Sequence, residues 1–496
     1  MVEEESYAAR GTSNRPKIEN SGCTIASMAT LSVGLERSGG IPLSVQIYNS
    51  IRGAIESGQL AVGARLPSWS DLAAQLGVSR GTVRAAYERL IDEQLAIGLG
   101  AAGTRVAARP VPAAIRWSPE APPLPDLFYE FSVAPLAFQM GVPAQDAFPF
   151  KLWSRIHARA ARRASAAPVG YPDPRGEPHL RQEIAAYLGV SRGLRCSPSQ
   201  VFVTAGFAGA LNLAIRGLRV EGGQAWMEDP GFPLTRRALG LAGMTVTGVP
   251  VDGDGLDTDA GVRMAPEAVL AVVTPGQHAP LGTTMSLARR ISLLCWAKNH
   301  DAFIVEDDYL GELQLKGRAA PALASLDEHG RVLHIGTFSK TISPALRLGF
   351  LVVPPDMAPR FGDVVACLAP APASSVQHAV TEFMHDGHYL RHLRRMKRLY
   401  AARQEALVRC LNEQARESLK VQPAAGMTVV AKLPDSSSDV DIALRARSVG
   451  LAPVPLSPWY LSNPTQQGLL LGVTNLNEET LWANCSRLLN LVRPRN

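Results

Sequence analysis

Lys340 is the residue whose setting most clearly suggests chemistry, in the segment RVLHIGTFSKTISPALRLGF. The apolar run before it is typical of a buried strand, and the ligand crevices of α/β sheets form where such strands end. Ser339 precedes it and Arg347 lies seven residues further on, and a hydroxyl group with an arginine suits a phosphate. An amine beside a phosphate clamp is what pyridoxal phosphate needs, because the amine forms a Schiff base with its aldehyde. The alternative for Lys340 alone is a solvated lysine at a strand end.

A second apolar strand, in FIVEDDYLGEL, ends at Asp307. Its carboxylate could reach the same crevice, and an aspartate beside a pyridine nitrogen keeps that nitrogen protonated, which makes the ring an electron sink. Tyr309, two residues on, could hydrogen-bond the ring hydroxyl. The alternative is an acidic loop at a strand end, which suits Asp308.

Two further segments could complete such a site. VFVTAGFAGAL is a strand, a glycine-containing turn and a helix start, and the free amides at Gly206 and Phe207 could hold a phosphate. MEDPGFPLTRR places Phe232 in a turn where its ring could stack on a flat cofactor. Each segment is weak evidence alone, because an aromatic side chain is more often part of the core.

The N-terminal part of the chain has a helical pattern. Apolar residues recur every fourth position and predict a first helix that ends at Gly58; they are Leu43, Ile47, Ile51 and Ile55. Ser68, with Asp71 three residues on, is expected to cap a second helix, DLAAQL, and Ser79 to cap a third. The four-residue turn GVSR joins these two helices, which is typical of a helix-turn-helix.

The third helix carries the residues expected to contact DNA. Arg80, Thr82 and Arg84 fall in its first two turns, with Ser79 and Ser68 at the two helix starts. LAIGLGAAGTRVA then predicts a β-hairpin that would form a wing. Residues 41–107 hold six Arg against five Asp and Glu, so charge alone does not separate this interpretation from a small helical domain for protein contacts.

The chain is expected to contain two unlike domains. Residues 1–40 are interpreted as a flexible arm, with Met28 as a possible alternative start, and 41–107 as the helical domain. Five prolines crowd the segment 108–130 and predict an extended linker. Over 131–496, apolar runs alternate with helical patterns, which indicates an α/β domain with a mostly parallel sheet.

Composition excludes several classes of protein. The 496 residues include no apolar stretch long enough for a transmembrane helix, so no membrane association is expected, and the N-terminus lacks the apolar core of a secretory signal. Six cysteines without CxxC pairs suggest neither a disulfide framework nor a metal site, and favour a reducing, cytoplasmic compartment. A net charge of +6 merely permits a polyanionic partner.

Resemblance to known families sharpens these expectations. The run IPLSVQIYNSIRGAIESGQLAVGARLPSWSDLAAQLGVSRGTVRAAYERL resembles the winged helix-turn-helix of the GntR regulators. Over 131–496 the ordered motifs YPDPRGEP, TAGF, EDPGF, TPGQHAPLG, EDDY, TFSK and PALRLG resemble the aspartate-aminotransferase fold, fold type I of the pyridoxal-phosphate enzymes. The fusion of the two is typical of the MocR (GabR-like) regulators.

The resemblance implies roles for individual residues. Lys340 would form the Schiff base, an internal aldimine, with pyridoxal phosphate. The other cofactor contacts would be Asp307 at the pyridine nitrogen, Tyr309 at the ring hydroxyl, Phe232 on the ring face, and Arg347, Ser339, Gly206 and Phe207 at the phosphate. The family also implies double-stranded DNA as a partner and a head-to-tail homodimer whose aminotransferase-like domain senses an effector.

The C-terminal domain departs from the aminotransferase pattern at four positions. Ala208 and Gly209 replace two glutamines of the phosphate turn, and Ala279 replaces an asparagine or aromatic residue near the ring. Leu470, in GLLLGVTN, stands where aminotransferases hold the substrate carboxylate with an arginine. Because leucine cannot grip a carboxylate, ordinary α-amino acids are expected to bind poorly unless Arg175 substitutes.

Three functions remain open on the sequence. The leading one is a transcriptional regulator that binds pyridoxal phosphate on Lys340 and senses a small amine or amino acid, with at most partial transaminase chemistry. A second is a sensor of pyridoxal phosphate itself, which the weakened cofactor contacts favour. The third is a genuine aminotransferase with an incidental N-terminal domain, against which Leu470 argues. The effector, the operator and the direction of regulation are not specified.

Overall fold

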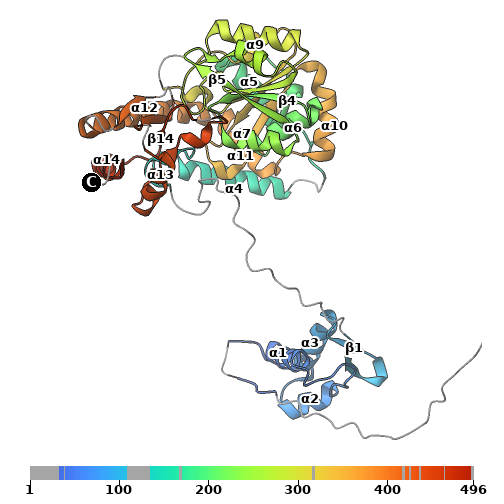
Figure 1. Ribbon diagram of the computed structural model, residues 1–496. Coiled ribbons are helices and arrows are strands. Elements are labelled where there is room, and N and C mark those ends of the chain that lie inside the picture. The colour runs from blue at the N-terminus through green and yellow to red at the C-terminus, as the bar shows by residue number, and fades with distance from the viewer. Residues whose placement is uncertain are drawn as a thin grey trace, which may run out of the picture. The chain divides into compact units, whose positions relative to one another are not determined.

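The computed structural model describes residues 33–37, 40–108, 135–166, 170–315, 319–415, 419–423, 426–434, 437–462 and 464–492. The chain divides into two compact units, Met1–Asp126 and Leu127–Asn496, of which the first is drawn in blue in Figure 1. Met28, most of the expected arm and nearly all of the expected proline-rich linker lie outside the described residues.

The N-terminal unit is a three-helix bundle followed by a hairpin. Its elements are α1 (Leu43–Glu56), α2 (Trp69–Leu76), α3 (Arg80–Asp92), β1 (Ala96–Gly98) and β2 (Thr104–Val106). The two strands pair antiparallel through a 3₁₀ turn at Gly100–Ala102, which gives the wing. The expected apolar stripes meet in one core that includes Ile47, Ile51, Val83, Tyr87 and Leu90. The predicted winged helix-turn-helix is therefore confirmed.

The turn between α2 and α3 is fixed at both ends. The Ser68 hydroxyl accepts the Asp71 amide at 3.1 Å, and the Ser79 hydroxyl accepts the Thr82 amide at 3.1 Å. Gly77 ends α2 with a φ of 61°, a conformation that favours glycine. Arg37 donates to the Gly77 carbonyl, so part of 33–37 packs on this turn.

The C-terminal unit is built on an eight-stranded sheet. Its strands are β3 (Val201–Thr204), β4 (Gln224–Asp229), β5 (Thr245–Asp252), β6 (Gly255–Leu256), β7 (Ala268–Val273), β8 (Phe303–Asp308), β9 (Val332–Thr337) and β10 (Gly349–Val352). Their order is β3-β10-β9-β8-β7-β4-β5-β6. The five strands β9, β8, β7, β4 and β5 run parallel, whereas β10 is antiparallel to β3 and β9. The predicted mostly parallel sheet is thus confirmed.

Helices cover both faces of this sheet, as Figure 1 shows. One face packs on α6 (Gly206–Leu218), α7 (Pro233–Leu241) and α10 (Ala358–Leu368). The opposite face packs on α5 (Pro178–Ser191), α8 (Thr258–Met264) and α9 (Leu287–Asn299). Successive residues of one strand alternate between the two cores: in β8, Ile304 faces the second group of helices and Val305 the first.

The last part of the chain forms a second layer that the sequence did not predict. Its strands, in the antiparallel order β11-β12-β14-β13, are β11 (Lys420–Pro423), β12 (Thr428–Lys432), β13 (Val454–Pro455) and β14 (Gly468–Gly472). The helices α12 (His388–Ala415), α13 (Asp439–Ser448) and α14 (Glu478–Val492) pack with this sheet, while α4 (Phe150–Ala166) packs on α11 (Ser374–His385). Among the described residues, no helix is long and apolar enough to cross a membrane.

Candidate cofactor site and DNA-binding surface

The carboxyl edge of the large sheet gathers the predicted cofactor residues. The neighbouring parallel strands β8 and β9 end at Asp308 and Thr337, so Asp307 and the turn that carries Lys340 come to the same edge. Strand β10 runs the opposite way and begins there, which brings Arg347, two residues before it, to that edge as well. The crossover between β9 and β10 therefore supplies both a lysine and an arginine.

The Lys340 amine is held by one backbone contact. Its Nζ donates to the Gly141 carbonyl at 3.1 Å. Burial lowers the pKa of Lys340, while the charge of Asp307 acts in the opposite direction. A lowered pKa favours the neutral amine, which is the form that attacks an aldehyde.

Asp307 has an unsatisfied buried carboxyl group. The residue is 8% exposed, and its Oδ1 has no hydrogen-bond partner among the described residues. Burial raises its pKa well above the usual range, and the charges of Asp308 and Glu228 add to this effect. Such a carboxyl group fits a cationic N–H donor, as the protonated pyridine nitrogen of pyridoxal phosphate would be. The residues present thus fit this cofactor.

Two aromatic side chains lie beside Asp307. Tyr309 and Asp307 line the same small hollow, and burial raises the pKa of the Tyr309 hydroxyl. Phe232, which precedes α7, has its ring centroid 5.6 Å from that of Trp459 and 6.3 Å from that of Phe207. Phe232 and Tyr309 pack against the same apolar cluster, so both expected ring contacts border one space. The sequence did not single out Trp459.

The turn before α6 and the Arg347 guanidinium form a second part of the site. Gly206 has a φ of 71°, and a Cβ there would lie within 3.9 Å of the Arg347 guanidinium. Arg347 also donates to the Ala205 carbonyl at 3.4 Å. Ser339 lies in the Lys340 turn, where its amide donates to the Thr337 hydroxyl at 3.2 Å. A helix N-terminus with an adjacent arginine is suited to a phosphate.

Two of the departures from the aminotransferase pattern, Ala279 and Leu470, form part of an apolar wall. Ala279 and Leu470 belong to one buried cluster with Trp459, and Phe232 and Tyr309 pack against it. Leu470 is fully buried, between Val430 and Val454 of the small sheet. The position expected to grip a substrate carboxylate thus contributes only hydrocarbon.

Arg175, the possible substitute for that arginine, has a partner of its own. Its Nε and Nη2 donate to the two carboxylate oxygens of Asp173 at 2.9 and 2.7 Å. Arg181 binds the same carboxylate at 3.0 Å. In the structure Arg175 is therefore paired with an acid of its own loop.

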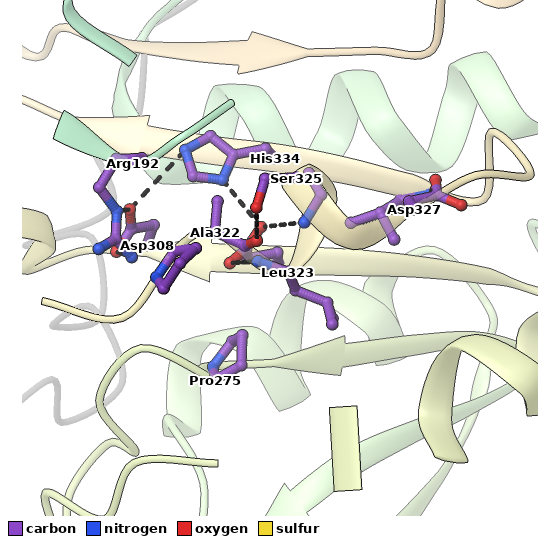
Figure 2. A network of polar contacts seen from close by, with 12 residues as sticks. Arg192, Pro275, Asp308, Ala322, Leu323, Ser325, Asp327 and His334 are labelled. Atoms are coloured by element: carbon purple, nitrogen blue, oxygen red, sulfur yellow. Dashed lines mark hydrogen bonds and ion pairs between the residues drawn. The ribbon is translucent and has the colours of Figure 1, made fainter. Parts of the chain in front are cut away.

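A buried polar network lies on the opposite face of β8, and sequence analysis missed it (Figure 2). Arg192 binds both carboxylate oxygens of Asp308, at 2.6 and 3.1 Å. The His334 imidazole contacts Glu306 at 3.0 Å and lies 3.8 Å from Asp308. Burial acts to raise the pKa of Glu306, but His334 and the amides of Leu323 and Ala324 outweigh it and hold this pKa below its usual range. The signal in the sequence was the alternation of FIVEDDY, which puts Glu306 and Asp308 on one face and Asp307 on the other.

Glu228 is a buried acid close to the site, and its titration should make the stability of the C-terminal unit depend on pH. It accepts the Thr274 hydroxyl at 2.6 Å, and burial raises its pKa to about 7. The folded protein therefore keeps a proton that the unfolded chain releases above pH ~4.3. Protonated Glu228 therefore stabilises the folded state relative to high pH. This stabilisation, on the order of 3 kcal/mol, is complete below pH ~4.3 and is lost as the pH rises through 7.

We expect Glu228→Gln to remove that part of the pH dependence. The measurement is the free energy of unfolding of the C-terminal unit at pH 5 and pH 8, by denaturant titration. Glu221→Gln, at an exposed acid paired with Arg216, should leave the difference between the two pH values unchanged. Equal pH dependence in both variants would show that Glu228 is ionised in the folded protein.

The predicted DNA-contacting residues share the start of α3. Arg80 and Arg84 are exposed and Thr82 is half-buried, so all three are accessible at this end of the helix. Arg84 also pairs with Glu88 at 2.7 Å and lies 5.6 Å above the Trp69 ring. Ser68 and Ser79 use their hydroxyl oxygens as helix caps, which positions the helices. Trp69, which is 41% exposed, was not singled out from the sequence.

Comparison with known proteins agrees with both halves of the structure. Residues 43–106 match the family model of the bacterial regulatory proteins of the gntR family, and residues 148–480 match that of the class I and II aminotransferases. An archaeal alanine:glyoxylate aminotransferase superposes with a TM-score of 0.67 at 24% identity, covering 73% of this chain and 91% of that chain. The α-aminoadipate aminotransferase LysN of Thermus thermophilus, solved with N-(5'-phosphopyridoxyl)-L-leucine, gives a TM-score of 0.64 at 26% identity, covering 72% of this chain and 92% of that chain. The fold and site define a DNA-binding regulator with an aminotransferase-like domain whose cofactor is pyridoxal phosphate.

Curated relatives match this chain over most of their length. The probable rhizopine catabolism regulatory protein MocR of Rhizobium meliloti is 36% identical over 460 residues, which cover 90% of this chain and 93% of that protein. The pyridoxine biosynthesis transcriptional regulator PdxR of Corynebacterium glutamicum is 30% identical over 461 residues, covering 92% of this chain and 97% of that protein. The chain belongs to the MocR-like family of GntR-type transcriptional regulators.

Proposed function

We propose that this regulator senses a small amine through the pyridoxal phosphate of its C-terminal domain. When bound, the cofactor supplies a reactive aldehyde and an electron-withdrawing ring. Lys340 is the attachment point, and Asp307 holds the proton at the pyridine nitrogen. Tyr309 and Phe232 border the ring, while Arg347, Ser339, Gly206 and Phe207 hold the phosphate. The observation that carries this proposal is the unsatisfied buried carboxyl of Asp307 at the sheet edge that also bears Lys340.

In the N-terminal domain, Arg80, Thr82 and Arg84 are proposed to contact the operator. Phosphate contacts would supply affinity that depends on salt, and the start of α3 would read the bases. Ser79 and Ser68 hold the helices in place. An effector that displaces Lys340 must bind the DNA-binding and non-binding states with different affinity, since only that difference shifts their populations.

The apolar wall at Leu470 favours an amine over an α-amino acid. A carboxylate placed against this apolar wall loses hydration without gaining a hydrogen bond, which costs ~1–3 kcal/mol or more and corresponds to roughly tenfold in affinity. We expect 2-phenylethylamine to shift the visible absorption of the holoprotein at concentrations at least tenfold below those of phenylalanine. The measurement is a spectral titration with each compound, with 2-phenylethanol as the control that lacks the amine. Tighter binding of phenylalanine would show that another group holds the carboxylate.

A second candidate function is a sensor of pyridoxal phosphate itself. Ala279 lies in the apolar cluster rather than offering a polar side chain to the ring, and Ala208 and Gly209 offer no side-chain contact to the phosphate. The similar protein PdxR is described as a regulator of pyridoxine biosynthesis. A true aminotransferase is less well supported, because Leu470 cannot hold a substrate carboxylate, and product formation from amino-acid and keto-acid pairs would reveal one.

The absorption spectrum of the purified protein separates these functions. A visible band present on purification supports a resident cofactor and an amine effector. A colourless protein that gains the band when pyridoxal phosphate is added supports the cofactor sensor. We further propose a head-to-tail homodimer and a cytoplasmic location, the latter because a chromosomal operator is the partner.

A further inference from the structure

Two helices of the C-terminal unit carry a large excess of positive charge. Helix α4 and the first 16 residues of α12 together contain eleven Lys and Arg and no Asp or Glu. The whole chain has a net charge of +6, so the remainder carries −5. The basic character of this protein is therefore concentrated in 33 residues outside its DNA-binding domain.

Each helix presents its basic residues as one exposed stripe. On α4 the stripe consists of Lys151, Arg155, Arg159, Arg162 and Arg163, and on α12 of Arg391, Arg394, Arg395 and Arg398. Spacings of three and four residues keep such side chains on one face of a helix. An ordinary solvated face mixes both signs of charge, whereas these stripes have one sign only.

The two stripes begin near a shared cluster of aromatic side chains. The Phe148 ring, beside the start of α4, lies 5.5 Å from the His392 ring of α12. Phe383 of α11 lies between, 5.6 Å from Trp153 and 6.2 Å from His392. Helices α4 and α12 each pack against α11, so the two stripes flank the same helix.

Most of these arginines have no acidic partner among the residues that the structure describes. Arg159 pairs with Glu382, and Arg391 contacts the Asp386 carbonyl and His388. Arg403, further along α12, is buried and bound to Asp146. For the other exposed arginines of the stripes, no ion pair or hydrogen bond connects the side chain to any described residue; they are Arg155, Arg162, Arg163, Arg394, Arg395 and Arg398.

We propose that this basic surface is a second contact for the phosphate backbone of the DNA that the winged helix holds. The N-terminal domain itself is nearly neutral, with six Arg against five Asp and Glu over 41–107, so its net charge contributes little long-range attraction to DNA. The stripe on α4 runs about 18 Å from Lys151 to Arg163, the span of about five phosphates of one DNA strand. This inference rests on DNA binding by the same chain.

The covalent connection between the two units makes such a contact favourable. Only 26 residues, 109–134, separate the described parts of the two units, and a chain of that length spans at most about 90 Å. DNA held by one unit is therefore present at a high effective concentration for the other. The surface needs no base recognition, because it would bind flanking DNA of any sequence.

The test compares two variants of equal net charge in the full-length holoprotein. The patch variant carries Arg155→Gln, Arg162→Gln, Arg394→Gln and Arg398→Gln. The control variant neutralises four exposed basic residues outside the stripes: Arg195→Gln, Arg263→Gln, Lys298→Gln and Arg409→Gln. Binding to a random-sequence 60-bp duplex is measured by fluorescence anisotropy over a range of salt concentrations.

We expect the patch variant to bind the duplex at least tenfold more weakly at 0.1 M salt than the control. Its slope of log affinity against log salt should be shallower by up to about 3.6, since each phosphate contact contributes ~0.9. Equal affinities and slopes for the two variants would overturn the proposal. Sedimentation measures the oligomeric state of each variant. If the patch variant has a changed oligomeric state but the same slope of log affinity against log salt as the control, the surface is an interface between copies of the chain and the proposal is overturned. Arg80→Ala tests the winged helix separately, so failure of either contact can be recognised.

Discussion

Lys340→Ala is expected to abolish covalent attachment of pyridoxal phosphate. No other lysine is placed by the structure at the carboxyl edge beside Asp307 among the described residues, so no amine should replace the lost one. We expect the wild-type protein, after borohydride reduction, to carry one cofactor per chain and the variant none. Intact-mass spectrometry measures the bound group, and the visible absorption band should disappear in parallel.

Lys298→Ala is the matched control for this experiment. Lys298 is an exposed lysine near the end of α9, so its removal should leave labelling unchanged. Circular dichroism and binding to random-sequence DNA show whether Lys340→Ala is folded. Equal labelling of wild type and Lys340→Ala would place the attachment point elsewhere and remove the basis of the proposed sensor.

Arg192→Met should destabilise the C-terminal unit by about 3–5 kcal/mol. The Arg192 side chain is almost fully buried and holds both oxygens of Asp308. Removal of one partner leaves the other as a buried charge without adequate compensation, which costs far more than the pair contributes. The free energy of unfolding at neutral pH, by denaturant titration, gives the loss directly.

The chain offers a close control for that variant. Arg175 also binds both oxygens of an aspartate, Asp173, but its side chain is 42% exposed. We expect Arg175→Met to cost no more than about 1 kcal/mol, because solvent screens an exposed pair. In a double variant, Asp308→Asn should recover part of the stability lost in Arg192→Met. Similar losses for the two arginine variants would mean that burial does not set the strength of these pairs.

The local elements of this protein could be predicted from its sequence. Helix caps such as Ser68 and Ser79, the turn at Gly77 and the apolar spacing of α1 are short-range features, and each predicted element appears in the structure. The cofactor motifs likewise follow strand ends, and parallel strands bring their carboxyl ends to one edge. For that reason the sequence alone predicts a common site for Lys340 and Asp307.

Only the tertiary structure decided which of the three acids in FIVEDDY is paired and which faces the cofactor site. The letters show three acids in a row, but Glu306 and Asp308 turn toward His334 and Arg192, while the Oδ1 atom of Asp307 has no hydrogen-bond partner among the described residues. The arginine comes from α5's end and the histidine from β9, 116 residues before Asp308 and 28 residues after Glu306. Sequence reasoning has no means of finding such partners, because their proximity depends on strand order and crossover paths. The sequence determined which groups were available, and the packing of distant segments determined which of their charges remain uncompensated and therefore free for chemistry.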